Sequence, residues 1–277
     1  MKFTQIWKNG EIRLAVETQR GLLLPESSRT ALQLIHGGKA AMEALEREMD
    51  SLPVYTDNVQ YAPAVSGMDK ILCVGLNYRS HIGECGEKEP EYPVLFSKFP
   101  NALGAHGEQV WLDPQYSEYD YEAELVIVMG KRIKLASEEE AKAAIFGYTC
   151  GNDLSNRTTQ LGRGGQWLVG KTMDGFGPIG PRVVTADELD PSDLRIMSRV
   201  NGETRQDART SLMIFSVPRI VSYISQQMTL ESGDVIFTGT PAGVMLGYAA
   251  EEKQWLRPGD RVEVEIEGIG VLKTKMI

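Results

Sequence analysis

The chain has 277 residues, of which 42% are hydrophobic and 24% charged, a composition ordinary for a folded globular protein. Its formal net charge of −9 and its pI near 5.0 argue against nucleic acid and anionic membranes as main partners. No run of about 18 apolar residues is present, so we expect no transmembrane helix, and the first residues carry no secretory pattern.

The three cysteines are odd in number and widely spaced, at Cys73, Cys85 and Cys150. They fit neither a disulfide framework nor a CxxC zinc site. We therefore expect the protein in a reducing compartment, the cytoplasm.

The first part of the chain predicts a small α+β domain. Residues 2–7 and 11–17 flank Asn9-Gly10, a dipeptide suited to the type I′ turn of a hairpin. Residues 28–49 predict a helix that the pair Gly37-Gly38 breaks into two pieces. Residues 51–67 are rich in proline and polar side chains and predict a linker, so we place the domains at 1–67 and 68–277.

The larger domain is predicted to be mostly β with a few short helices. Residues 71–76, 122–129 and 261–267 have strand patterns, the last with strict alternation. Residues 137–147 predict a helix with Ser137 and Glu140 as a capping box and Gly147 as its stop, and residues 218–228 predict another.

Two carboxylates form the first chemical motif. Glu122 and Glu124 lie two residues apart, so their side chains would leave the same face of a strand and repel each other. A divalent cation removes that repulsion, and hard oxygen ligands suit Mg²⁺, Mn²⁺ or Ca²⁺ better than zinc. A solvated strand face is the alternative, and for an isolated pair it is the more common one.

A polar segment after the next apolar stretch offers further ligands. Asp153 could supply a third oxygen, although an N-cap on a short helix is an equally ordinary role for it. Arg157 and Gln160 would share one helical face and could bind a carboxylate and a carbonyl oxygen.

Two more segments could bind an anion. Lys171 lies in a setting where an ammonium could be partly buried beside an anion, although a surface lysine is the usual case. Thr240 lies in a glycine- and proline-rich turn whose backbone N–H groups and hydroxyl are good anion donors; a plain β-turn is the alternative.

His81 and Glu84 form a candidate acid–base pair. They would face each other on one helical turn, and a carboxylate beside imidazole raises its basicity and orients it. The segment around them contains several glycines and charges and could act as a lid. An exposed histidine without a role is the alternative.

These segments, in this order, resemble the fumarylacetoacetate hydrolase family from about residue 71 to the end of the chain. The motifs that carry the resemblance are VGLNYRSHIGE, PVLFSK, DYEAEL, GNDLSNRTTQ, GKTMDGFGPIGP, VNGETRQ and GDVIFTGTPAGV. A single such motif is weak evidence, whereas seven in register are highly specific.

The resemblance implies the mixed β-sandwich roll of that family, with a small appended N-terminal domain and assembly as a homodimer. It implies a Mg²⁺ or Mn²⁺ site on Glu122, Glu124 and Asp153. It also implies that the substrate is held by a second group of side chains, namely Arg157, Gln160, Lys171 and Thr240. His81 and Glu84 match the lid dyad of the acylpyruvase-like branch.

The expected substrate is a small 2-oxo acid, and the expected reaction is hydrolysis of the C–C bond of an acylpyruvate-like 2,4-dioxo acid through a metal-stabilised enolate. His81, oriented by Glu84, would activate water, and Lys171 would help to hold the enolate. Oxaloacetate decarboxylation or tautomerisation and isomerisation of a 2-hydroxy-dienedioate use the same enolate and stay open, as does a non-catalytic ligand-binding role.

Overall fold

Two β-sheets form the framework of the protein, and the computed structural model describes residues 1–277. The larger sheet has 11 strands: β1 (Lys2–Lys8), β2 (Glu11–Thr18), β3 (Gly21–Leu23), β4 (Gln60–Ala62), β5 (Ile71–Gly75), β6 (Val94–Lys98), β7 (Leu103–Gly104), β10 (Ala123–Met129), β11 (Ile145–Asn152), β13 (Gly177–Thr185) and β16 (Val235–Phe237). The second has five: β8 (Gln109–Val110), β14 (Arg195–Val200), β15 (Glu203–Arg209), β17 (Arg261–Ile266) and β18 (Gly270–Met276). A separate short pair joins β9 (Tyr119–Asp120) to β12 (Ser155–Asn156).

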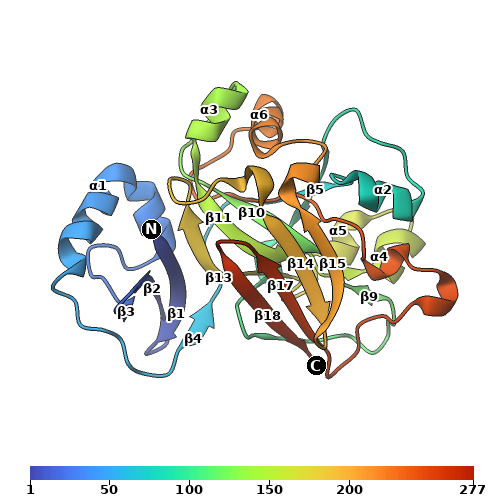
Figure 1. Cartoon of the computed structure of the whole chain (residues 1–277), viewed down its shortest axis with the longest axis horizontal. Helices are drawn as coiled ribbons and strands as arrows, with labels where there is room; N and C mark the ends of the chain where they lie inside the picture. The colour runs from blue at the N-terminus through green and yellow to red at the C-terminus, as the bar shows by residue number, and fades with distance from the viewer.

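Six α-helices lie around these sheets (Figure 1). They are α1 (Ala31–Met49), α2 (Arg79–Cys85), α3 (Glu138–Ala143), α4 (Arg157–Gly162), α5 (Trp167–Lys171) and α6 (Val217–Gln227). The N-terminal elements lie at one end of the molecule, and α2, α4 and α5 gather at the opposite end (Figure 1). None of these helices is both long and apolar enough to cross a bilayer.

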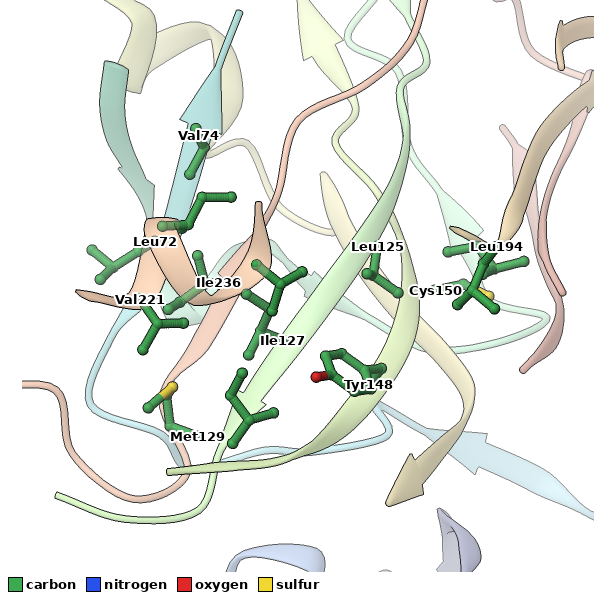
Figure 2. Close-up of a cluster of buried hydrophobic side chains, with 14 of the residues drawn as sticks. Leu72, Val74, Leu125, Ile127, Met129, Tyr148, Cys150, Leu194, Val221 and Ile236 are labelled. Atoms are coloured by element: carbon green, nitrogen blue, oxygen red, sulfur yellow. The ribbon is translucent and has the colours of Figure 1, made fainter. Parts of the chain in front are cut away.

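Strand β10 shows how the sequence builds the core on both faces of the large sheet. Every residue of β10 is buried, and alternate side chains enter different clusters. Leu125 and Ile127 belong to the cluster that includes residues of the second sheet and α6, and Figure 2 shows part of this cluster with Ile236 of β16 and Val221 of α6. Val126 and Val128 share the other cluster with residues of α1. The predicted mostly β fold with a few short helices is confirmed.

The N-terminal strands continue the large sheet. Strand β1 pairs with β2 in the predicted hairpin and also with β13, where Lys2 is opposite Val184. Positive φ angles at Asn9 and Gly10 agree with the predicted turn. Within the predicted linker, β4 forms a third pairing with β1. The boundary between residues 67 and 68 stays a prediction.

The structure agrees with the predicted kink in one helix and corrects the predicted end of another. Helix α1 is kinked at Gly38, which has φ 54° and ψ −140°, as the glycine pair predicts. Helix α3 has the predicted capping box, but the prediction that it extends to Gly147 is wrong. Gly147 lies in β11, where a Cβ atom would come 2.3 Å from the carbonyl oxygen of Val184. The glycine therefore permits close strand pairing and does not stop a helix.

Candidate active site

A cavity of about 220 Å³ opens at the end of the molecule where α2, α4 and α5 lie (Figure 1). It brings together eight of the nine side chains singled out from the sequence: His81, Glu84, Glu122, Glu124, Arg157, Gln160, Lys171 and Thr240. The ninth, Asp153, is fully buried next to Lys171. Segments that are far apart in the chain thus converge on one hollow, as the sequence predicts.

The three predicted metal ligands meet because β10 and β11 are antiparallel neighbours. Glu124 lies opposite Gly151, and the backbone N–H of Asp153 donates to the carbonyl of Glu122 at 2.9 Å. Carboxylate oxygens of Glu122, Glu124 and Asp153 all lie within 4.8 Å of one another, and all three residues are buried. The alternative of an N-cap role for Asp153 is wrong, because Asn156 caps α4.

Positive side chains surround two of these carboxylates. Lys171 donates to Glu122 at 2.6 Å and to Asp153 at 3.0 Å. Arg157 donates to the other oxygen of Glu122 at 2.6 Å. Burial would raise the pKa of Glu122, but Lys171 and Arg157 lower it well below its ordinary value. Burial lowers the pKa of Lys171, and the charges of Asp153 and Glu122 reverse this into a net rise. Both groups are therefore held in their charged forms.

Glu124 lacks such a partner. Its only hydrogen bond comes from the backbone N–H of Gly239 at 2.7 Å. Burial, together with the negative charges of Asp153 and Glu122, raises its pKa well above the ordinary value. The Oδ1 atom of Asp153 is also buried; the ammonium of Lys98 lies 2.6 Å from it, but no hydrogen bond of good geometry joins them. Glu124 therefore needs a proton or a bound cation to offset its charge in this cluster.

The charges and the donor atoms of the site fit a hard divalent cation. Four buried carboxylates, counting Asp120, face three buried cations, counting Lys98. Uncompensated charge in a protein interior is costly, and oxygen ligands are those that Mg²⁺ and Mn²⁺ prefer.

Two residues of this network were missed in the sequence. Asp120 accepts two hydrogen bonds from Arg157, at 2.8 and 2.9 Å, and two from the backbone N–H groups of Met245 and Leu246, at 2.8 and 3.0 Å. It precedes Glu122 by two residues, so the same alternation that pairs Glu122 with Glu124 could have found it.

Lys98 is the other missed residue. Its ammonium lies 2.6 Å from Asp153 and donates to the carbonyls of Phe176, Leu154 and Lys171. In the sequence, Lys98 ends both the apolar stretch of β6 and the family motif PVLFSK, but neither feature assigns it a role. Lysine is rarely buried, so the sequence alone predicts an exposed side chain.

The dyad lies on α2 and lines the same cavity as Glu122 and Glu124. Nδ1 of His81 lies 2.8 Å from Oε1 of Glu84, as the i, i+3 spacing predicts. The chain enters α2 through Leu76, whose φ of 57° is unusual for a non-glycine residue. Asn77 fixes this turn through side-chain hydrogen bonds to Phe215 and to the carbonyl of Thr238. His81 is buried rather than exposed and idle.

The surroundings of His81 favour its charged form. Burial lowers the imidazole pKa, but contacts with Cys85 and Glu84 and the charge of Glu122 raise it to about 9. Glu84 is itself fixed, because its second oxygen accepts a hydrogen bond from the backbone N–H of Gly243 at 2.8 Å. The pair can therefore hold and transfer a proton at the cavity wall.

The predicted substrate-binding residues differ in what they offer. Gln160 accepts from Arg157 at 2.9 Å and makes no other side-chain hydrogen bond within the protein, so its amide NH₂ is available to a ligand. The Thr240 hydroxyl donates to the carbonyl of Ala123 and accepts from Gln206. Thr240 thus lines the cavity, but its hydroxyl is already engaged.

Comparison with known proteins agrees with this geometry. Residues 70–277 match the family described as fumarylacetoacetate (FAA) hydrolase C-terminal. A mitochondrial oxaloacetate tautomerase of Bos taurus is 39% identical over 257 residues, which cover 91% of this chain and 81% of that protein.

Solved structures give the same result. A fumarylacetoacetate hydrolase from the psychrophilic Exiguobacterium antarcticum has 34% sequence identity and a TM-score of 0.88, covering 100% of this chain and 99% of that one. A maleylpyruvate hydrolase from Sphingobium sp. SYK-6, solved with manganese(II) and pyruvate, has 26% identity and a TM-score of 0.82 at the same coverage. The chain belongs to the fumarylacetoacetate hydrolase family.

Proposed function

We propose that the protein is a divalent-metal-dependent enzyme that interconverts the enol and keto forms of oxaloacetate or a close 2-oxo diacid. One observation carries this proposal: the hydrogen-bonded pair of His81 and Glu84 opens into the same cavity as the carboxylate cluster. The relative with 39% identity is named an oxaloacetate tautomerase, which is why we place this reaction ahead of C–C hydrolysis, the first expectation from the sequence.

Glu122, Glu124 and Asp153 would hold Mg²⁺ or Mn²⁺. When bound, such a cation supplies Lewis-acid stabilisation of negative charge on the 2-oxygen of the substrate. The remaining residues of the site would bind the anionic substrate and move its proton. Arg157 and Lys171 contribute positive charge, and the free amide of Gln160 offers a donor to an oxygen.

The protonated form of His81 suits transfer of a proton to a carbon atom of the substrate. With its pKa raised to about 9, the imidazole is protonated at neutral pH. It would deliver its proton to C3 of the enol while the enol hydroxyl releases a proton to water. His81 then takes a proton back from solvent, so that the turnover gives the keto acid with no net change in protons. Glu84 would orient the ring and stabilise the imidazolium. In the reverse direction, neutral His81 would remove the C3 proton.

The test is a tautomerase assay that follows the ultraviolet absorbance of the enol, combined with a metal-binding titration. We expect His81→Ala to lower kcat by on the order of 10²–10⁴-fold, the usual contribution of a positioned acid or base, and to leave metal affinity nearly unchanged. Equal loss of turnover and metal affinity in that variant would contradict the roles assigned here.

A second candidate is hydrolysis of an acylpyruvate-like 2,4-dioxo acid. The similarity to a maleylpyruvate hydrolase crystallised with pyruvate favours it, since pyruvate is a product of such cleavage. Here His81 would act in its neutral form and take a proton from water. Measuring pyruvate release from a 2,4-dioxo acid beside the loss of the enol form of oxaloacetate distinguishes hydrolysis from tautomerisation. The same panel detects decarboxylation and dienedioate isomerisation.

Assembly as a homodimer and a cytoplasmic location stay predictions, as does the absence of nucleic-acid and membrane partners. Static light scattering of the purified chain would test the dimer directly.

A further inference from the structure

A second cluster of potential metal ligands lies on α2. His81, Glu84 and Cys85 occupy positions i, i+3 and i+4, so they share one face of a single helical turn. Their ligand atoms all lie within 4.8 Å of one another, with Sγ of Cys85 3.8 Å from Nδ1 and 3.9 Å from Nε2 of His81. All three residues line the cavity, so an ion can reach them from solvent.

The donor atoms of this cluster differ from those of the carboxylate cluster. Sulfur, imidazole nitrogen and a carboxylate oxygen form a borderline-soft set that suits Zn²⁺, whereas three carboxylates suit Mg²⁺ or Mn²⁺. Tetrahedral zinc with bonds of about 2.0–2.3 Å keeps its ligands roughly 3.3–3.8 Å apart. The present spacing is close to this, so small side-chain rotations on one helical turn would complete the ligand set.

We propose that His81, Glu84 and Cys85 form a second, inhibitory metal site for Zn²⁺ that is separate from the carboxylate cluster. The fourth position would face the cavity and be filled by water. On binding, the thiol of Cys85 and the protonated imidazole of His81 each release a proton to solvent, and the thiolate and the neutral imidazole then bind the ion. The hydrogen bond between His81 and Glu84 is lost, so the imidazole can no longer transfer a proton.

Binding at this site can be observed without any assay of activity. Co²⁺ replaces Zn²⁺ in such sites, and its bond to a thiolate gives a charge-transfer absorption in the near ultraviolet. The other cysteines are shielded: Cys73 and Cys150 are fully buried, and the thiol of Cys150 donates to the carbonyl of Gly270. A thiolate band therefore reports on Cys85.

The experiment titrates Co²⁺ into the full chain in the presence of excess Mg²⁺. We expect one thiolate band per chain in the wild type, loss of the band in Cys85→Ser and in Cys85→Ala, and an unchanged band in Glu124→Ala, which disrupts the carboxylate cluster. A wild type without the band, or a band that survives replacement of Cys85, would overturn the proposed site.

The inhibitory effect rests on the proposed function and is tested separately. Zn²⁺ added to the Mg²⁺-loaded enzyme should inhibit the tautomerase, and more Mg²⁺ should not restore the rate. The Zn²⁺ concentration that halves the zinc-free rate should be at least about tenfold higher for Cys85→Ser than for the wild type. Relief by Mg²⁺, or equal sensitivity of both proteins, would instead place the ion on the carboxylates. If no activity is found, the Co²⁺ titration still decides the site.

Discussion

The ammonium of Lys98 lies 2.6 Å from Oδ1 of Asp153, with both side chains fully buried. Lys98 also donates to the carbonyl of Phe176 at 2.8 Å and to that of Leu154 at 3.3 Å. It therefore ties the end of β6 to the segment that carries a predicted metal ligand. A buried lysine with several partners holds Asp153 in place without entering the cavity.

Replacing Lys98 should therefore weaken both the fold and the metal site. We expect Lys98→Met to lower the free energy of unfolding by about 3–5 kcal/mol, the usual cost of removing one partner of a buried ion pair. Metal affinity should also fall, because Asp153 loses the group that orients it. Urea unfolding with and without Mg²⁺ measures both quantities.

A matched control for that variant is Lys273→Met. Lys273 pairs with Glu263 at 2.9 Å, but its side chain is 56% exposed. Exposed pairs contribute only about 0–1 kcal/mol, so this variant should unfold almost like the wild type. If the two lysine variants lost the same stability, the buried pair would have no special role.

The histidine pKa can be measured directly. The chain has three histidines, so an NMR titration of the metal-free protein, assigned with His81→Ala, resolves each ring. His81 should titrate near pH 9, while burial and Lys273 should hold the pKa of His106 below its ordinary value. Glu84→Gln should shift the pKa of His81 downward, because the carboxylate that favours the imidazolium is lost and only Cys85 and Glu122 still favour it.

The same shift links His81 to stability. Because its folded-state pKa lies above the ordinary value of 6.5, its contribution is complete below about pH 6.5 and is lost as the pH rises through 9. A pKa for His81 near or below 6.5 in the folded protein would contradict this account of the dyad.

Asp120 should act on substrate binding through Arg157. Asp120→Asn keeps the size of the side chain but removes the charge that fixes the guanidinium. We expect KM to rise about tenfold with a smaller effect on kcat, because in the proposed role Arg157 would bind substrate equally in the ground and the transition state. Stability should fall by about 1.5–3 kcal/mol, as for a charged hydrogen bond.

The control for this variant is Asp207→Asn, since Asp207 pairs with Arg195 at 2.6 Å on the surface and its side chain is 45% exposed. Steady-state kinetics and urea unfolding of both variants give the comparison. A folded Asp120→Asn enzyme with an unchanged KM would show that Asp120 does not position Arg157.

Local spacing in the sequence accounts for much of the site. The i, i+2 pair Glu122 and Glu124 and the i, i+3 pair His81 and Glu84 each lie on one face of one element, so the sequence alone indicates that the members of each pair meet. The family motifs then indicate that the two pairs share a cavity.

Contacts between distant segments could not be predicted in this way. Lys98 is buried because the end of α5 and the segments around Leu154 and Phe176 close around it, and these contacts come from distant parts of the chain. Gly147 resembles a helix stop in the sequence, yet its role is set by the approach of β13. Tertiary packing decides both positions, and it overrides the local preference of each residue.

We infer that Glu122, Glu124 and Asp153 bind one hard divalent cation. Calorimetric titration of Mg²⁺ or Mn²⁺ into the metal-free chain, paired with thermal unfolding, tests it most directly. The account predicts one ion per chain and a stabilisation of about 2.7 kcal/mol when the free ion is at 100 times its Kd, lost in Glu124→Ala and kept in the surface variant Glu138→Ala. A wild type that binds neither ion, or a Glu124→Ala variant that binds as well as the wild type, would contradict it.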